Sequence, residues 1–483
     1  MSTVVQTASE RGSYAAEVDL LARIGPRLTG AQAQEQLIDH VHRSLAKLGL
    51  EVHTDTHVFA RWEGAADSAG LALFVGSERV DIAAAFPYSG VTGADGVRGR
   101  LRRLRGPLPF WPAATRGVAV VQVRNRPFPM SAFVGTWGDE AWGRMTNPLL
   151  PATIAGLSLG HARRAGVKGV VFAWDRVSAA NARSQYLPFV FDYQRIPAVF
   201  VAGDAATKVL AAAGRGETAR LVLDASLTPN ASTRTIWATV EGCRRPDETI
   251  LVVTHSDGTN VVEENGHIGL LALARDVSAH TPDRTVVFVL VTGHLRMRAV
   301  TRHGQALTRW LRDHPELWAG GPGQRRAVAG LAIEHLGARE FRDDPTTGSF
   351  APTGRAEPEL LYASTRELTA LLHREWRGAE PGPTRVSKPT PLFHFGEGQP
   401  MYQRRIPTVA LVTAPQYLLS ETPGHYVDID LMHRQVDSFR RLLGRLDTTP
   451  STDIGTVPAT TLPRKAAALI GSSARFLWSM RAR

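Results

Sequence analysis

The chain of 483 residues is 43% hydrophobic and 21% charged, which is the composition of a folded globular protein and excludes a largely disordered or fibrous one. At roughly 150 residues per domain, this length predicts about two to four domains. The formal net charge is +11, and 51 of the 56 basic residues are arginines, but they are scattered along the chain. Because nucleic-acid binding requires clustered basic residues, we expect no nucleic-acid partner.

The cysteine content and the termini bear on compartment and metal chemistry. Cys243 is the only cysteine, which excludes an internal disulfide and a cysteine-based zinc site. The N-terminal segment lacks the apolar run of a signal peptide, and no window reaches the roughly 18 consecutive apolar residues of a membrane span. We therefore expect a cytoplasmic protein in which any metal ion is bound by His and carboxylate side chains.

The predicted elements begin with two helices. Apolar residues recur at helical spacing over residues 14–49, interrupted by the turn GPRLTG, and predict a helix pair. The next segment, EVHTDTHVFARW, alternates apolar and polar residues and predicts a half-buried strand. From 66 to 230, short apolar runs such as VDIAAAF and GVKGVVFAW are separated by Gly and Pro. This pattern predicts a separate β-rich insert with short helices.

Beyond residue 231 the pattern becomes mixed α/β. The apolar strands ETILVVTH, RTVVFVLVTG and AVAGLAIEHLG alternate with the helices HIGLLALARDVSA and ALTRWLRDH. Such an alternation predicts a mostly parallel sheet flanked by helices on both faces. After residue 447 we expect a flexible linker and then the basic tail RKAAALIGSSARFLWSMRAR. We favour packing or fraying of this tail over binding to a membrane surface.

Ionisable residues follow the ends of these strands. They are His255 with Asp257, Glu263 with Glu264, His294, and Glu334 with His335, and a later loop adds Glu421, His425 and Asp428. Loops at the carboxyl ends of parallel strands converge on one crevice, where imidazoles and carboxylates suit zinc. The sequence therefore predicts a metal site at this edge of the sheet, with Glu421 or His425 as its last ligand.

Several of these residues have alternative explanations. Asp257 lies two residues after His255, on the same side of a strand, where its carboxylate can fix the imidazole tautomer. Glu264 precedes a helix, whose dipole favours a carboxylate, and His294 could serve as a cap or a buried hydrogen-bond partner. Glu334 ends a buried apolar strand and therefore needs a metal ion or another cation nearby.

The motifs together resemble the co-catalytic zinc aminopeptidase family, which includes glutamate-carboxypeptidase-like enzymes, with a protease-associated insert domain. The residues that carry the resemblance are GPRLTGAQAQEQLIDHVHRSLAKLGLEVHTD, GVKGVVFAW with IPAVFVAGDAATKVLAAAG, THSDG, ENGHIGLLALAR and RTVVFVLVTG. The likeness covers most of residues 15–447. It implies an aminopeptidase-like α/β domain over 1–65 and 231–447, a protease-associated-type insert over 66–230, and a linker with a basic tail over 448–483.

The resemblance also implies roles in binding zinc. Members of this family bind two zinc ions, and His255 matches their first ligand, with Asp257 as its orienting carboxylate. The bridging ligand falls on Glu264 or its neighbour Glu263. Glu334 stands where the family has the aspartate of the second metal, one methylene longer.

Other positions depart from the family pattern. The acid pair of the family is replaced by His294 and Leu295, which leaves His294 as a ligand or as the general base. The final histidine is replaced by Glu421, so either Glu421 or His425 is the last ligand. Glu397 lies near an acidic residue of the family, and we expect it to contact the substrate.

Two functions follow from this altered set. The first is a metal-dependent hydrolase that cleaves peptide or related amide bonds through a water activated by one or two zinc ions. Its substrate would be a peptide or an amino-acid-derived small molecule. The second is a catalytically degenerate aminopeptidase-like pseudoenzyme that binds such a ligand without hydrolysis, since fold alone does not determine function. The sequence does not indicate an oligomeric state.

Overall fold

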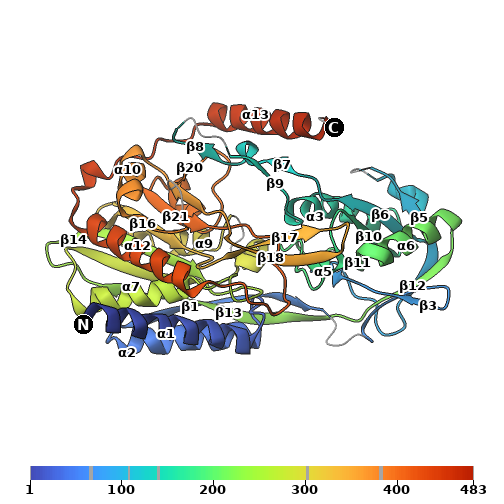
Figure 1. Cartoon of the computed structure of the whole chain (residues 1–483), viewed down its shortest axis with the longest axis horizontal. Coiled ribbons are helices and arrows are strands. Elements are labelled where there is room, and N and C mark those ends of the chain that lie inside the picture. Colours follow the sequence, from blue (N-terminus) through green and yellow to red (C-terminus); the bar gives the residue numbers. More distant parts are fainter. Residues whose placement is uncertain are drawn as a thin grey trace.

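A computed structural model describes residues 2–64, 69–106, 109–138, 142–300, 304–379 and 385–481, with side chains described from residue 9 to residue 472. Two large sheets organise the chain, one of nine strands and one of eight. Figure 1 shows them side by side along the longest axis, with the helices α1, α7 and α12 beside the first sheet and α6 beside the second.

The nine-stranded sheet has a parallel centre. Its order is β1 (Val52–Glu63), β13 (Ser226–Val240), β15 (Arg284–Val291), β14 (Arg245–His255), β16 (Arg326–Ile333), β21 (Thr408–Val412), β19 (Leu360–Ala363), β20 (Val386–Lys388) and β8 (Gly135–Thr136). The strands β15, β14, β16 and β21 are parallel, and antiparallel pairs flank them. The predicted α/β fold with a mostly parallel sheet is thus confirmed, with the parallel strands at its centre.

Helices cover both faces of this sheet. Along β14 the alternation of a strand directs Ile250 and Val252 to one apolar core and Leu251 and Val253 to another. The first core is covered by α1 (Ser2–Ile24), α2 (Gln32–Lys47), α7 (His267–Ala279), α10 (Arg366–Glu375) and α12 (Ile429–Thr448), and the second by α9 (Leu307–Asp313) and α11 (Gly398–Gln403). Helices on both faces explain why these strands are continuous apolar runs.

The eight-stranded sheet is built within the predicted insert. Its order is β3 (Glu78–Val80), β2 (Leu71–Val75), β12 (Thr218–Leu223), β5 (Val97–Leu104), β6 (Val118–Arg124), β10 (Gly169–Asp175), β11 (Ala198–Val201) and β4 (Ala84–Ala85). Helix α6 (Gly203–Arg215) packs on one core of this sheet, while α3 (Leu149–Gly156) and α4 (Leu159–Arg164) contribute to another. A β-rich unit with short helices therefore occupies this part of the chain, as its apolar pattern predicts.

Shorter elements connect the two sheets. They are the antiparallel pair of β7 (Phe128–Pro129) and β9 (Arg144–Met145), the hairpin of β17 (Arg339–Asp344) and β18 (Ser349–Ala356), and the helices α5 (Ala179–Ala182) and α8 (Met297–Val300). Asp343 of β17 accepts hydrogen bonds from the backbone N–H of Ser178 and from Asn181 Nδ2, at 3.0 and 2.9 Å. Strand β8, although within residues 66–230, pairs with β20 of the first sheet. The insert is thus bound to the α/β unit at several places.

The segment after residue 447 differs from the predicted flexible linker. Ile454 and Val457 are buried, and the backbone oxygen of Ile454 accepts a hydrogen bond from Thr365 Oγ1 at 2.8 Å. Two buried apolar side chains explain why this polar, Pro-containing segment is held against the domain. It leads to α13 (Leu462–Arg481), which lies beside β7 (Figure 1). Among the described helices, none has the length and apolar character needed to cross a membrane.

Candidate metal centre and active site

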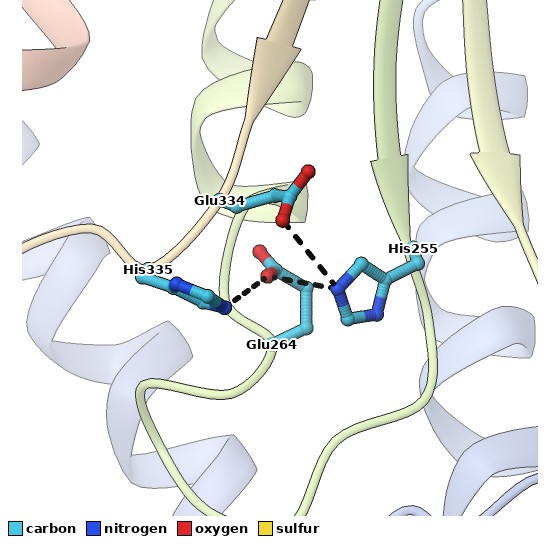
Figure 2. A group of neighbouring side chains, drawn as sticks. All are labelled: His255, Glu264, Glu334 and His335. Carbon is cyan, nitrogen blue, oxygen red and sulfur yellow. Dashed lines mark ion pairs between the residues drawn. The ribbon is translucent and has the colours of Figure 1, made fainter. Parts of the chain in front are cut away.

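Four ionisable side chains converge at the carboxyl end of the parallel strands. His255 is the last residue of β14, Glu334 and His335 follow β16, and Glu264 precedes α7. All four are at most 3% exposed. Figure 2 shows the two imidazoles and two carboxylates pointing toward one another. We call these four residues the primary cluster.

Three separations within the primary cluster are close to those of a tetrahedral metal site. A zinc ion with bonds of about 2.1 Å to nitrogen and oxygen places its ligand atoms about 3.4 Å apart. His255 Nε2 lies 3.3 Å from Glu264 Oε2 and 4.0 Å from Glu334 Oε2, and His335 Nε2 lies 3.6 Å from Glu264 Oε2 (Figure 2). Two histidines and two carboxylates are a ligand set that zinc accepts.

Ligand atoms of this cluster also lack hydrogen bonds. Among the described residues, His255 Nε2, Glu264 Oε2 and His335 Nε2 are buried atoms that find no hydrogen-bond partner. Buried polar atoms in folded proteins nearly always have one. Three such atoms directed at one point therefore fit a cation that they coordinate together.

The two imidazoles are fixed so that Nε2 faces the cluster. His255 Nδ1 lies 2.7 Å from the backbone oxygen of Asp257, and His335 Nδ1 lies 2.9 Å from the backbone oxygen of Thr413. For His255 a proton on Nδ1 leaves the lone pair of Nε2 for a metal ion. His335 Nδ1 also accepts a hydrogen bond from the backbone N–H of Thr413 at 3.1 Å. We expected the Asp257 carboxylate to orient His255, but Asp257 does so through its backbone carbonyl, since its Oδ1 is 4.0 Å from Nδ1.

The carboxylate of Asp257 instead joins three segments of the chain. Its Oδ2 accepts hydrogen bonds from Thr29 Oγ1 at 2.5 Å and from the backbone N–H groups of Gly293 and Leu295, both at 3.1 Å. Asp257 is fully buried and therefore supports the turn that carries His294 rather than contacting a substrate. The catalytic role predicted for Asp257 becomes a positioning role.

Glu264 interacts with the start of a helix and also faces the primary cluster, the two roles that its sequence position allows. Its Oε1 accepts hydrogen bonds from the backbone N–H of Gly266, at the start of α7, and from Thr254 Oγ1. Its Oε2 faces the primary cluster. One oxygen therefore interacts with the helix N-terminus while the other remains available as a ligand.

A buried arginine supports the loop that carries Glu263 and Glu264. The guanidinium of Arg27 is fully buried and donates hydrogen bonds to the backbone oxygens of Asn260, Glu263 and Glu264, at 2.6, 2.9 and 3.2 Å. It thus binds the backbone of this loop and leaves the carboxylates directed at the cluster. Burial of the guanidinium lowers the pKa of Arg27 to about 10, so it remains a cation at neutral pH.

The pKa directions are those of buried acids and bases that share one site. Burial, followed by the charges of Glu334 and Glu263, raises the pKa of Glu264 well above its usual range. Burial also raises the pKa of Glu334 to about 7. Burial, followed by the neighbouring His294 and His335, holds the pKa of His255 well below its usual range. A bound cation favours ionised carboxylates and neutral imidazoles, and so stabilises the cluster in its ligating form.

His294 lies beside the primary cluster. Its ring stacks on that of His255 with centroids 4.0 Å apart, and its Nδ1 lies 2.9 Å from Glu397 Oε1. Its Nε2 is 4.0 Å from Glu263 Oε1. Burial opposes the charged form, but the hydrogen bond with Glu397 and the charges of Glu397 and Glu263 outweigh it and raise the pKa of His294 to about 10.

Glu397, for which we expected substrate contact, lies behind His294 in the structure. It is fully buried, and its oxygens accept hydrogen bonds from the backbone N–H groups of Ala306 and Leu307 as well as interacting with His294. Its own backbone N–H donates to Glu334 Oε1 at 2.5 Å. Glu397 thus orients His294 through its carboxylate and Glu334 through its backbone N–H.

The described residues place neither candidate for the last ligand in the primary cluster. Neither Glu421 nor His425 belongs to the groups of His and carboxylate side chains that the described residues place close enough to hold an ion, and His425 is exposed. Burial raises the pKa of Glu421 to about 7, but its backbone N–H donates to Ser184 of the insert side of the site. The fourth member of the cluster is His335.

Sequence reasoning noted His335 but did not assign it as a ligand. Neighbouring residues of a strand point to opposite faces, so Glu334 and His335 were not expected to converge. His335, however, has a φ of 54°, which is the left-handed conformation that ordinary side chains seldom adopt. This turn ends β16 and brings both side chains to the cluster. The adjacency of Glu and His at a strand end was the available signal.

A pocket of about 430 Å³ opens onto the site. Glu263, His294, Glu334 and His335 lie in its wall, together with apolar residues of both units. Phe189 of the insert packs against His294 with ring centroids 5.6 Å apart. The cluster is therefore buried on one side and faces a cavity on the other, as a catalytic site requires.

Solved structures share this architecture. The chain superimposes on a Peptidase M28 precursor from Shewanella amazonensis SB2B with a TM-score of 0.64 and 14% identity, over 93% of this chain and 96% of that one. A zinc aminopeptidase from Bacillus subtilis gives a TM-score of 0.62 at 14% identity, over 93% and 98%. An aminopeptidase from Aneurinibacillus sp. strain AM-1 gives 0.61 at 12% identity, over 93% and 97%.

These likenesses establish the class of fold. The chain has the fold of the zinc aminopeptidases, and the resemblance inferred from its motifs is confirmed at that level. No family model and no curated protein matches the sequence. At 12–14% identity, the chemistry has to be argued from the site of this chain.

Proposed function

We propose that this protein is a zinc-dependent hydrolase of peptide or related amide bonds. One observation carries the proposal: three buried and unpartnered ligand atoms of His255, Glu264 and His335 face one point at the separations of a tetrahedral site. Glu334 supplies the fourth ligand. The shared fold of the zinc aminopeptidases supports the same chemistry.

We infer that the site holds one ion rather than two. A second group of candidate ligands consists of His255, Glu263 and His294, so His255 belongs to both groups. Its Nδ1 is occupied by the backbone oxygen of Asp257, which leaves Nε2 for a single ion. This leaves Glu263 and His294 for proton transfer, with Glu263 Oε2 at the border of the primary cluster, 3.1 Å from His335 Nε2.

Within this proposal the chain itself moves the protons of amide hydrolysis. A zinc ion, when bound, supplies a Lewis acid that polarises a carbonyl and lowers the pKa of water. Glu263 lines the pocket and takes the proton of the attacking water as general base. His294, which lies between the carboxylates of Glu397 and Glu263, carries a proton on Nε2 and donates it to the leaving amine as general acid.

The experiment that tests the proposal is elemental analysis of purified protein, of His335→Ala and of His425→Ala. We expect about one equivalent of zinc in the wild type and in His425→Ala, and none in His335→Ala. The same samples are then assayed with peptide and acyl amides before and after chelation. Metal-free wild type that does not bind added zinc would overturn the proposal.

The alternative of a binding protein without catalysis has one supporting observation. Leu295 is fully buried in an apolar core, where the resembled family has half of its acid pair, so this position supplies no acid or base. One equivalent of bound zinc without turnover of any amide, although amides bind, would favour this alternative.

A further inference from the structure

The pocket at the site has an almost entirely apolar wall that comes from both units. The insert contributes Phe128, Phe133, Leu150 and Leu187, and the α/β unit contributes Phe393 and Val412 among others. Met130 and Met145 also line it, and flexible methionine side chains adapt to ligands of different shape. Such a wall binds an apolar group by removing it from water.

The ionisable groups in the pocket wall all belong to the site. Among the described lining residues, the ionisable ones are Glu263, His294, Glu334 and His335, all of which belong to the site itself. The other polar lining residues are neutral, and Asn147 is engaged through its Nδ2 by the backbone oxygen of Ala414 at 3.0 Å. A substrate that extends along the pocket therefore leaves the reacting end as an uncharged chain.

The size of the pocket exceeds one amino-acid side chain. At about 30 Å³ for each water-sized group, a volume of about 430 Å³ accommodates roughly 14 non-hydrogen atoms. This lies within the range of pockets that hold small-molecule ligands rather than single side chains. A leucine side chain, with four carbons, would leave most of it empty.

We propose that the substrate is an amide of a medium-length, uncharged apolar acyl chain, with the amide at the cluster and the chain along the pocket. This inference rests on the proposed function and specifies its substrate class. Hydrolysis breaks the C–N bond, transfers the hydroxyl of water to the acyl carbon and leaves a proton on the amine. The products are a carboxylic acid with the apolar chain and a free amine.

The test is a series of fluorogenic amides assayed with the zinc-loaded protein. The acetyl, butanoyl, octanoyl and decanoyl amides of one coumarin amine are compared with its leucyl amide. Each methylene that enters an apolar wall is expected to raise kcat/KM about threefold, so the octanoyl amide should exceed the acetyl amide by at least about 100-fold. The leucyl amide should fall below the octanoyl amide.

Two variants distinguish an effect of the pocket wall from a general effect of introducing a tryptophan. Leu150→Trp places a large ring in the pocket wall and should remove most of the gain in kcat/KM from butanoyl to decanoyl. Leu157→Trp, at a position that follows the same helix and is 66% exposed, is the matched control and should preserve the full series.

The outcomes distinguish this inference from the proposed function. Zinc-dependent cleavage of the leucyl amide without any gain along the acyl series would overturn the inference and leave the hydrolase standing. Calorimetric binding of the octanoyl amide without cleavage would support the apolar-chain ligand and contradict the hydrolase. Absence of both binding and cleavage for the octanoyl amide would overturn the inference.

Discussion

Two regions of this molecule bring histidine and carboxylates together, and they differ in how charge is balanced. One is the primary cluster of His255, Glu264, Glu334 and His335. The other, which we call the helix cluster, consists of Glu10, His433 and Asp437 between α1 and α12. In both, nitrogen and oxygen atoms lie within 4.8 Å of one another.

An arginine occupies the helix cluster. Arg440 lies 3.1 Å from Glu10, 3.0 Å from Asp437 and 2.7 Å from Asp276, and so supplies the positive charge that these carboxylates need. In the primary cluster the corresponding cation, Arg27, bonds to backbone oxygens instead. The two clusters thus differ in that an arginine contacts the carboxylates of the helix cluster directly, whereas Arg27 contacts only the backbone beside the primary cluster.

The largest expected difference comes from removing ligands. His255→Ala combined with Glu334→Ala should eliminate bound zinc and reduce amide hydrolysis by at least about 100-fold, since even the loss of an outer partner of a ligand costs 10–100-fold. His433→Ala, in the helix cluster, should retain the metal and the activity. Elemental analysis and initial rates measure both. Loss of zinc in His433→Ala would contradict the distinction between the clusters.

The second prediction distinguishes a role of His294 in proton transfer from a role in metal binding. His294→Gln should keep one equivalent of zinc but lower kcat about 100–10,000-fold, the usual contribution of a general acid or base. A buried histidine outside both clusters, His394, stacks on Tyr362 and provides a control as His394→Gln. If zinc is lost from His294→Gln, then His294 is a ligand and the single-ion assignment is wrong.

Substitutions of Arg27 and of Arg440 should separate metal affinity from stability. Arg27→Gln removes three hydrogen bonds from the loop of Glu263 and Glu264 and should weaken zinc binding about 10–100-fold. Arg440→Gln should destabilise the fold by about 1–3 kcal/mol and leave zinc affinity unchanged. Calorimetric zinc titration and thermal unfolding of each variant give the two quantities. Equal zinc affinities in the two variants would show that Arg27 does not position the loop of Glu263 and Glu264 for zinc binding.

The smallest predicted effect is a difference in how the two clusters respond to pH. Because burial raises the pKa of Glu334 to about 7, protons compete with zinc below pH 7, and affinity should fall about tenfold for each pH unit. Burial opposes ionisation of Glu10 as well, but Arg440 and His433 outweigh it and lower its pKa. Zinc titrations at pH 8, 7 and 6 measure the first effect.

The pKa of Glu10 is shifted in the opposite direction to that of Glu334. A lowered pKa in the folded state contributes stability that is present above the unfolded pKa of about 4.3 and is lost as the pH falls through the lower value. The contribution of the helix cluster to the free energy of unfolding should therefore be constant from pH 8 to pH 6. A Glu10→Gln difference in stability that vanishes within this range would contradict it.

Much of the fold could be predicted from local patterns. The apolar runs of β14, β15 and β16 and the helical spacing of α2 and α7 follow directly from which faces are buried, and the change in pattern near residues 66 and 230 reflects the second sheet. The buried Ile454 was not predictable, because its partners, such as Thr365, lie far away along the chain.

Part of the site was predictable from the positions of its residues relative to the predicted strands and helices. His255, Glu264, Glu334 and His294 end strands or begin a helix, and strand ends of a parallel sheet meet at one edge. The role of His335 depends on a left-handed turn, and that of Glu397 depends on backbone donors of α9. Neither a turn of one residue nor a long-range hydrogen bond leaves a periodic signal in sequence.

The pocket wall comes from residues of both units, whereas all four members of the primary cluster come from strand ends and a helix start of the α/β unit. Substitutions in the insert can therefore remodel which chains fit without disturbing the coordinating groups. In evolutionary terms, the proposed function would let mutations of the pocket-lining insert residues change the accepted substrates while the coordinating residues stay the same.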